Sequence, residues 1–343
     1  MNGIFVTGLG AVSPAGWGVP ALRSALERGE PLPRKPVARP GWDRPLLIRE
    51  VPPASPVPAF FGHPRLRRVS PITHHVIASA LEAMESAGAG GARQPEKLGL
   101  VMCLLSGCVQ YTHRFFDETL RHPATASPVL FPETVFNAPA SHLAALLGSA
   151  PVTYTLLGDP ATFLQGVAWA ADWLLEERVD GCLVVGAEET NWLLADVLWQ
   201  FDHRAVLGGG AGALYLSRRP EGSPGVELSL ITDAAVYSVR QNRTQAAQAM
   251  RRLLPAGQAD ELLCDSRQNR PRVDAAETAA WRDWPGQRLS PRSVLGEGLM
   301  AASAWQCVAA CEALARDAFP AAQVSVVGPN QQAVGARFVR RGA

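Results

Sequence analysis

In the first part of the chain, short runs of apolar residues alternate with amphipathic stretches in which apolar and polar residues are mixed. The apolar runs at 3–8 (GIFVTG), 98–105 and 152–157 (VTYTLL) predict buried strands. The stretch at 163–177 (FLQGVAWAADWLLEE) has helical spacing, and another apolar run follows at 181–187 (GCLVVGA). Short buried strands that alternate with helices are typical of α/β proteins.

Four other stretches fill in this first part. Residues 8–16 (GLGAVSPAG) read as a loop after the first strand, and the proline-rich residues 30–66 as an irregular surface excursion. Residues 71–88 have helical spacing and end on a glycine, which predicts a helix. Residues 206–217 (VLGGGAGALYLS) read as a glycine-rich turn followed by a strand.

The same order of elements partly repeats further along the chain. Strands are expected at 227–238, 261–266 and 324–328. Helices are expected at 243–255 and 297–315, the second of them rich in small residues.

This repetition predicts two similar α/β halves. The segment RRPEGSPG near residue 220 would join them, because proline, glycine and charged residues replace the apolar pattern there. The expected halves are residues 1–220 and residues 221–343.

Composition agrees with a compact protein that has a large core. The chain has 343 residues, of which 47% are hydrophobic and 18% charged. Its formal net charge of +1 does not favour a polyanionic partner such as a nucleic acid.

The N-terminal residues lack the features of a secretory signal, and no apolar run reaches the ~20 residues that span a bilayer. The six cysteines form no CxxC pair, so reduced thiols in a cytoplasmic protein are the expected state. The adjacent His74 and His75 lack further metal ligands at suitable spacing. We therefore expect a cytoplasmic protein with no metal site, no cofactor and no membrane span.

Four motifs in their order along the chain resemble the β-ketoacyl synthase family, which has the thiolase fold. Residues 6–16 (VTGLGAVSPAG) resemble the opening strand and loop of that family, and 127–148 the segment before its nucleophile. Residues 176–189 resemble its strand ending in a Gly-Ala-Glu turn, and 206–216 its glycine-rich strand, with Gly209 where a glutamate is usual. The resemblance implies a thiolase-like α/β fold in which the two halves form a layered αβαβα core.

The chemistry of this family needs a cysteine at the start of a buried helix to carry the acyl chain as a thioester. Matching the motif of that family on Leu164 and Gln165 puts the nucleophile position at Pro160, within a degenerate nucleophile turn at 158–163. Proline offers neither a nucleophile nor a backbone N–H. A shift of one residue reaches Asp159 or Ala161 and recovers no thiol.

Two histidines complete the catalytic set of the family, where they assist decarboxylation and stabilise the developing negative charge. Three residues hold the spacing of the first histidine motif: Pro271, Asp274 and Glu277. That spacing places Ser266 at the first histidine position. In the second motif, Arg292 stands for the usual lysine and Glu297 for the histidine.

The distribution of histidines supports this assignment without any alignment. The chain has seven histidines, and none follows His203. The half that should supply both catalytic imidazoles therefore supplies neither. The resemblance implies that this chain is a homologue of 3-oxoacyl-[acyl-carrier-protein] synthase, an acyltransferase, and that it lacks the Cys-His-His set of that enzyme.

Several aromatic residues are candidates for an acyl pocket or a subunit interface. Phe131 and Phe136 lie in the segment that, by resemblance, reaches toward the acyl pocket of the partner subunit. Phe163 begins the helix after the nucleophile turn, and Tyr154 lies in the strand that pairs across the dimer axis in the thiolase fold. Packing in the core is an equally good interpretation for each phenylalanine.

The resemblance implies a catalytically silent ketosynthase-like subunit, or chain-length factor. Such a pseudoenzyme would form a heterodimer with an active ketosynthase in type II polyketide or fatty-acid-like biosynthesis, including aryl-polyene-like systems, and would shape the acyl pocket. An acyl carrier protein is a further expected partner, and the chain alone could form a homodimer.

Two alternatives remain open from the sequence. An acyltransferase or hydrolase could use a displaced residue on the same fold, for example Ser266 as nucleophile with Glu297 as acid. A stand-alone protein that binds an acyl carrier or a lipid is the other.

Overall fold

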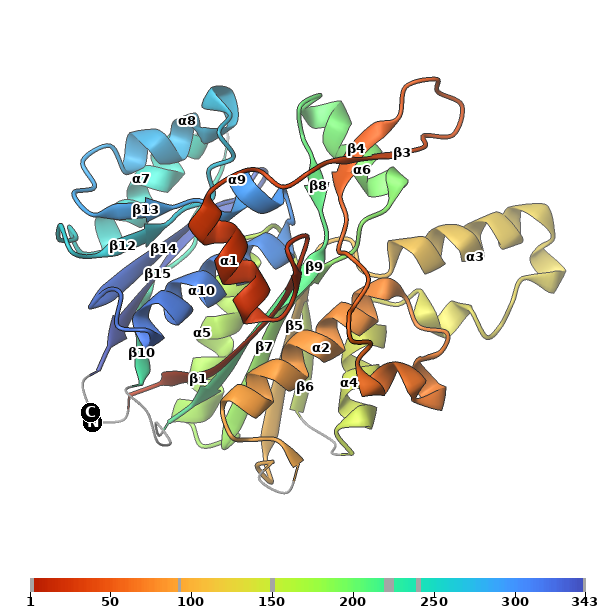
Figure 1. Ribbon diagram of the computed structural model, residues 1–343, viewed down its shortest axis with the longest axis horizontal. Helices are drawn as coiled ribbons and strands as arrows, with labels where there is room; N and C mark the ends of the chain where they lie inside the picture. The colour runs from red at the N-terminus through yellow and green to blue at the C-terminus, as the bar shows by residue number, and fades with distance from the viewer. Residues whose placement is uncertain (1–2, 92–93, 149–151, 219–224, 239–241, 342–343) are drawn as a thin grey trace.

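The computed structural model describes residues 3–91, 94–148, 152–218, 225–238 and 242–341. Its core is a mixed sheet to which both halves of the chain contribute strands (Figure 1). Within these residues the sheet runs in the order β13-β12-β14-β15-β10-β1-β9-β7-β5-β6. β13 and β6 are therefore its two edges.

Each half supplies five strands in the same spatial succession. Those of the first half are β1 (Phe5–Ser13), β9 (Gly210–Ser217), β7 (Gly181–Glu188), β5 (Leu98–Leu104) and β6 (Val152–Leu157). Those of the second half are β10 (Val226–Ile231), β15 (Gln332–Arg340), β14 (Ala321–Val327), β12 (Leu262–Cys264) and β13 (Gln287–Leu289). In both series the first two pairings are antiparallel and the last two parallel.

The two series meet where β1 pairs antiparallel with β10, with Val6 opposite Val226. The predicted pair of similar halves is thus present as a repeated strand order. The expected boundary at residue 220 falls outside the described residues.

Two helices form the middle layer between the strands of the two halves: α5 (Thr162–Leu175) and α10 (Met300–Ala315). Both belong to one apolar cluster that also holds strand residues from each half, such as Val101 and Val324. Gly186 on β7 lets α5 and α10 pack closely, because a Cβ there would lie 2.7 Å from the Phe163 ring.

Four helices cover the outer faces of the sheet: α2 (Pro71–Ser86), α4 (Ala138–Leu146), α7 (Arg243–Leu253) and α8 (Pro271–Ala280). Along β5, Leu100 and Met102 face α2 and α4, whereas Val101 and Cys103 face the middle layer. This alternation explains why β5 is apolar at nearly every position. Together the layers give the αβαβα arrangement of the thiolase-like fold.

The remaining elements lie around this core. The helices are α1 (Val19–Arg28), α3 (Val109–Arg121), α6 (Trp192–Phe201) and the short α9 (Pro291–Leu295). Two-residue strands β2 (Gly16–Trp17) and β11 (Ala235–Val236) extend the large sheet, while β3 (Lys35–Val37), β4 (Leu46–Arg49) and β8 (Leu207–Gly208) form a small one. Single 3-10 turns lie at η1 (Ala59–Gly62), η2 (Pro64–Leu66), η4 (Pro123–Thr125) and η5 (Phe131–Glu133). α3 projects from the body of the molecule (Figure 1).

The loop predicted at 8–16 is wrong, because β1 continues through it to Ser13. Gly8 and Gly10 are needed for packing rather than for a turn. A Cβ on either would lie 1.9 Å from a backbone oxygen of α2, that of Ala83 or Ser79. The glycines therefore let α2 approach the strand.

Other boundaries also differ from the predictions. The excursion at 30–66 contains the strands β3 and β4. The strand expected at 227–238 is divided into β10 and β11. The helix expected from 297 begins at Met300, because Leu299 takes a left-handed φ of 48° and interrupts the helical path.

The six cysteines are all buried and free of disulfides, in agreement with the reduced thiols that the sequence predicts. Within the described part of the chain, no helix has both the length and the apolar character required to cross a bilayer. The same part shows no group of three or more histidine, cysteine, aspartate or glutamate side chains arranged to hold a metal ion.

Candidate functional site

The turn between β6 and α5 is held by the side chain of Asp159. Its Oδ1 accepts a hydrogen bond from the backbone N–H of Ala161 at 3.0 Å, and its Oδ2 accepts one from Gln331 at 3.1 Å. Pro160 is buried and has no N–H to donate. The turn therefore offers no thiol, and the N–H of Ala161 is already engaged.

Asp159 also connects this turn to the second half of the chain. Gly328, directly after β14, leaves room for it: a Cβ there would lie 1.9 Å from Asp159 Oδ2. Burial raises the pKa of Asp159, whereas its backbone hydrogen bonds and the positive charge of Arg292 oppose that shift. The aspartate is thus a buried link between the two halves.

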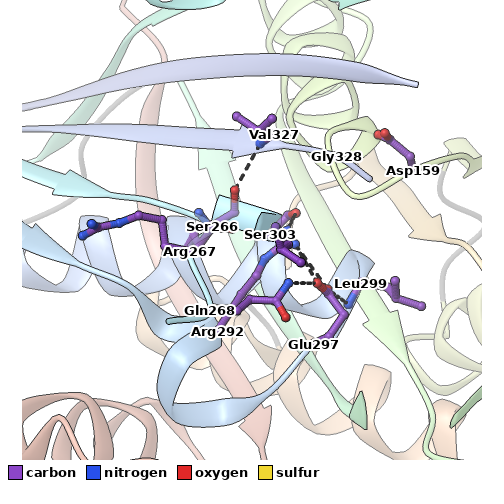
Figure 2. A network of polar contacts seen from close by, with 12 residues as sticks. Asp159, Ser266, Arg267, Gln268, Arg292, Glu297, Leu299, Ser303, Val327 and Gly328 are labelled. Carbon is purple, nitrogen blue, oxygen red and sulfur yellow. Dashed lines mark hydrogen bonds and ion pairs between the residues drawn. The ribbon is translucent and has the colours of Figure 1, made fainter. Parts of the chain in front are cut away.

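Ser266 also lies at the end of β14, on the side away from Asp159. Its hydroxyl donates to Glu277 Oε2 at 2.8 Å. Its Oγ accepts from the backbone N–H of Val327 at 3.2 Å, as Figure 2 shows. The backbone N–H of Ser266 donates to the same carboxylate oxygen at 3.0 Å. The hydroxyl therefore both donates and accepts a hydrogen bond within the protein.

Glu277 accepts these bonds in a fully buried position on α8. Burial, and secondarily the negative charge of Asp265, raise the pKa of Glu277 to about 7. Ser325 also donates a short hydrogen bond to it, and Trp281 donates to the Ser325 hydroxyl at 2.9 Å. The carboxyl group of Glu277 is the centre of a structural network that fastens α8 to β14.

Glu297 belongs to a second network around a buried ion pair. Its carboxylate lies 3.0 Å from Arg292 Nη1 and accepts from the backbone N–H of Leu299 at 2.8 Å. Gln268 Nε2 donates to Glu297 Oε2 at 2.6 Å, and Arg292 Nη2 donates to Ser303 Oγ at 3.2 Å (Figure 2). Three donors therefore converge on Glu297 and keep this carboxylate fixed.

These groups form what we call the buried polar cluster: Asp159, Ser266, Gln268, Glu277, Arg292, Glu297 and Ser303. Val327 and Gly328 join its two sides, since one contacts Ser266 and the other packs on Asp159. The positions that the sequence singled out, Pro160, Ser266, Arg292 and Glu297, thus gather at one end of β14. The carboxylate that binds Ser266 is that of Glu277 and not that of Glu297, the residue considered above as an acid beside it.

The cluster contains no group suited to nucleophilic catalysis through a thiolate. Burial raises the pKa of all six cysteine thiols, so none is ionised at neutral pH. The histidine on α4, His142, is bound to Glu133 at 2.9 Å in the first half of the chain. No histidine occurs in the half that supplies Ser266 and Glu297.

The aromatic candidates lie in two different environments. Phe131 and Phe136 are exposed on the segment between α3 and α4, and Tyr154 is exposed on the edge strand β6. Phe163 is fully buried in the middle layer, where it packs against Gly186. The first three are available to a partner, whereas Phe163 is a core residue.

Sequence reasoning did not single out Asp159, Gln268 and Ser303 as members of this cluster. An aspartate immediately before Pro160 at a helix start is a local signal for a side chain that binds the following backbone. Gln268 and Ser303 carry no such signal, because their partners, Glu297 and Arg292, come from other segments.

Buried carboxyl groups give the protein a testable response to pH. Glu188 and Glu277 are fully buried, and desolvation raises the pKa of each to about 7. In the unfolded chain a glutamate has a pKa of about 4.3. Between these values the unfolded state loses a proton that the folded state keeps, so the free energy of unfolding should fall as pH rises from 5 to 7 and then level off.

Urea unfolding at pH 5, 6, 7 and 8 measures this slope, which is on the order of 1 kcal/mol per pH unit for each residue. Glu277→Gln should reduce the slope, because an amide does not titrate. A wild-type protein whose stability rises between pH 5 and 7, or a variant with an unchanged slope, would show that these carboxyls are not protonated in the fold.

Comparisons with known proteins give the family and the fold. The model of the β-ketoacyl synthase N-terminal domain matches residues 1–194, which is more than half of the chain. None of the curated protein sequences matches this chain.

Three solved structures share the architecture over the whole chain. A β-ketoacyl synthase from Burkholderia phymatum STM815 has a TM-score of 0.83 at 17% identity, with 100% of both chains covered. The ishigamide ketosynthase/chain length factor has a TM-score of 0.80 at 19% identity, covering 99% of this chain and 100% of that one. The AntDE:AntF structure, a type II PKS acyl-carrier protein in complex with its ketosynthase, has a TM-score of 0.80 at 14% identity with the same coverage. At these identities the likeness establishes the fold.

Proposed function

Because the chain belongs to the β-ketoacyl synthase family, we propose that it is a catalytically silent ketosynthase-like subunit of the chain-length-factor type. Its role would be to pair with an active ketosynthase and to shape the pocket that receives the growing acyl chain. The narrower context is type II polyketide or fatty-acid-like biosynthesis, with aryl-polyene-like systems included.

The observation that carries this proposal is the filling of the catalytic positions. Pro160, Ser266 and Glu297 occupy the places that resemblance gives to the cysteine and the two histidines, and Arg292 that of the lysine. Each polar member is held by partners inside the protein: Ser266 by Glu277 at 2.8 Å, and Glu297 by Arg292 at 3.0 Å. These contacts hold both side chains within the fold, and neither residue restores the thiol or the imidazoles that the condensing chemistry requires.

The edge strand β6 supports the proposed pairing with a second subunit. β6 lies at the end of the sheet, and its side chains Val152, Tyr154 and Leu157 are between 41% and 51% exposed. An exposed apolar edge is prone to aggregation unless another chain covers it. A partner that pairs with β6 would bury this edge.

Aromatic side chains extend the apolar surface from β6 onto α5. The Tyr154 ring centroid lies 5.3 Å from those of Trp169 and Trp173, and Trp169 is 42% exposed. Aromatic residues of this kind are enriched at the centres of protein interfaces. Phe131 and Phe136, exposed on the α3–α4 segment, would then reach toward the acyl pocket of the partner.

The partners we propose follow from this arrangement. An active ketosynthase with an intact Cys-His-His set is the main one, in a cytoplasmic heterodimer that also receives an acyl carrier protein. A homodimer would form only when the chain is alone. The displaced-residue alternative finds less support, because Ser266 is only 5% exposed and no histidine base occurs in its half of the chain.

Acyl loading of the purified chain tests the proposal. After incubation with acyl-CoA or acyl carrier protein, intact mass spectrometry should find no stable acyl adduct, since the cysteines are buried and the site has no thiol. Malonyl carrier protein should likewise not be decarboxylated. A stoichiometric adduct on any residue would contradict the silent role.

A further inference from the structure

A pocket lies on the other side of the molecule from β6, between α1, α10 and the edge strand β13. In Figure 1, α1 crosses in front of α10 beside the ends of β12 and β13. The pocket has a volume of about 200 Å³. It lies at the edge of the sheet, where all three residues of β13 line it together with residues of α1 and α10.

The walls of the pocket are aliphatic and aromatic. Their larger members come from all the surrounding elements: Leu22, Leu26, Leu262, Leu289, Val308 and Phe319. Ala309 and Ala313, one helical turn apart on α10, make room between them. These alanines are 7% and 8% exposed, whereas Cys307 and Cys311 on the same helix are completely buried. The small side chains of α10 therefore leave an opening on the side facing α1.

The charges at the rim are paired with one another. Glu312 lies 3.1 Å from Arg23 and 2.7 Å from Arg316, and Arg316 also lies 3.2 Å from Glu27. The wall residue Arg288 lies 3.7 Å from Asp265. Arg23 and Arg316 share the carboxylate of Glu312, so the rim charges largely offset one another and none of these arginines lies apart from a carboxylate.

From these observations we infer that the pocket between α1, α10 and β13 is a binding site for an uncharged apolar group of roughly eight non-hydrogen atoms. An apolar cavity of about 150 Å³ is known to admit benzene, and this pocket is somewhat larger. Apolar walls favour such a group through the area removed from water. The end of an acyl chain and a small aromatic ring share this chemistry.

The pocket is separate from the buried polar cluster. Neither Pro160, Ser266 nor Glu297 lines it. The inference therefore stands or falls independently of the proposed silent role.

Binding of 1-hexanol and toluene to the full chain tests the inference, with hexanoate as the charged counterpart of hexanol. Methyl NMR should show saturable shifts at Val308 and Leu289, and the neutral ligands should raise the midpoint of thermal unfolding. Hexanoate should bind at least tenfold more weakly than hexanol. A preference between hexanol and toluene would tell whether the site takes a chain or a ring.

Ala313→Leu and Ala309→Leu fill the pocket and should each weaken binding at least tenfold. Ala315→Leu, on the exposed side of the same helix, is the matched control and should bind as the wild type does. The use of two filling variants guards against one that fails to fold. Absence of saturable binding to the wild type, undiminished binding to both filled variants, or tighter binding of hexanoate would each overturn the inference.

Discussion

A negative charge in the middle of β6 is expected to separate the heterodimer and to abolish the product of the partner ketosynthase. In Tyr154→Asp the carboxylate replaces a ring that packs edge-on against Trp169 and Trp173. If β6 pairs with its partner strand, this carboxylate loses its water without gaining a counter-ion, which costs several kcal/mol. Obligate interfaces of the class expected here bury more than about 2,000 Å² around a hydrophobic centre, where such a cost is largest.

Size-exclusion chromatography with light scattering, together with product analysis of the reconstituted pair, measures both effects. Thr155→Lys, at the next position of the strand, is a second variant with the opposite charge. Gln287→Asp on β13, the opposite edge of the sheet, is the matched control and should leave the complex intact. A folded Tyr154→Asp protein that stays bound and supports full product formation would show that β6 is not the interface.

Loss of one member of the Arg292–Glu297 pair is expected to destabilise the protein severely. Arg292→Met leaves the carboxylate of Glu297 without its cation. The Glu297 side chain is only 8% exposed, so water cannot replace that cation. Removal of one partner from a buried pair typically costs about 3–5 kcal/mol. The guanidinium bond to Ser303 is lost in the same variant. We therefore expect a fall of this size in the free energy of unfolding, measured by urea titration.

Two comparison variants separate charge burial from general damage. Arg292→Met combined with Glu297→Gln removes both charges and keeps an oxygen for the N–H of Leu299, so it should recover part of the loss. Lys35→Met breaks an ion pair of 3.4 Å to Glu50 that is exposed on both sides, and should change stability by no more than about 1 kcal/mol. A cost for Arg292→Met as small as that for Lys35→Met would show that the pair does not hold the site together.

Much of the architecture was predictable from the sequence because its signals are local. The continuous apolar run of β5 and the helical spacing of α5 each follow from burial, on two faces for the strand and mainly on one for the helix. The repeat of these patterns in the second half predicted two similar halves, although the strands β13 and β15 were not expected. The resemblance to the family also singled out Pro160, Ser266 and Glu297, which come from three different segments of the chain.

The parts that sequence reasoning missed depend on contacts between distant segments. From the sequence, Gly8 is interpreted as a loop residue. The structure shows that a side chain there would collide with the backbone of α2, which packs against β1. The contact of Ser266 with Glu277 was not anticipated, because no local pattern tells which buried carboxylate faces a hydroxyl. The sequence does not distinguish Phe163 from Phe136, since both are phenylalanines near apolar residues. In the structure Phe163 is buried in the middle layer, whereas Phe136 is exposed.

The central claim is that this chain carries no acyl group while its partner does, and acyl loading of the heterodimer tests it most directly. The complex would be incubated with acyl carrier protein and then separated, and the intact mass of each subunit determined. We predict a shift of one acyl group on the ketosynthase, which serves as the internal positive control, and none on this chain. An acyl adduct on this chain at a comparable level would contradict the account.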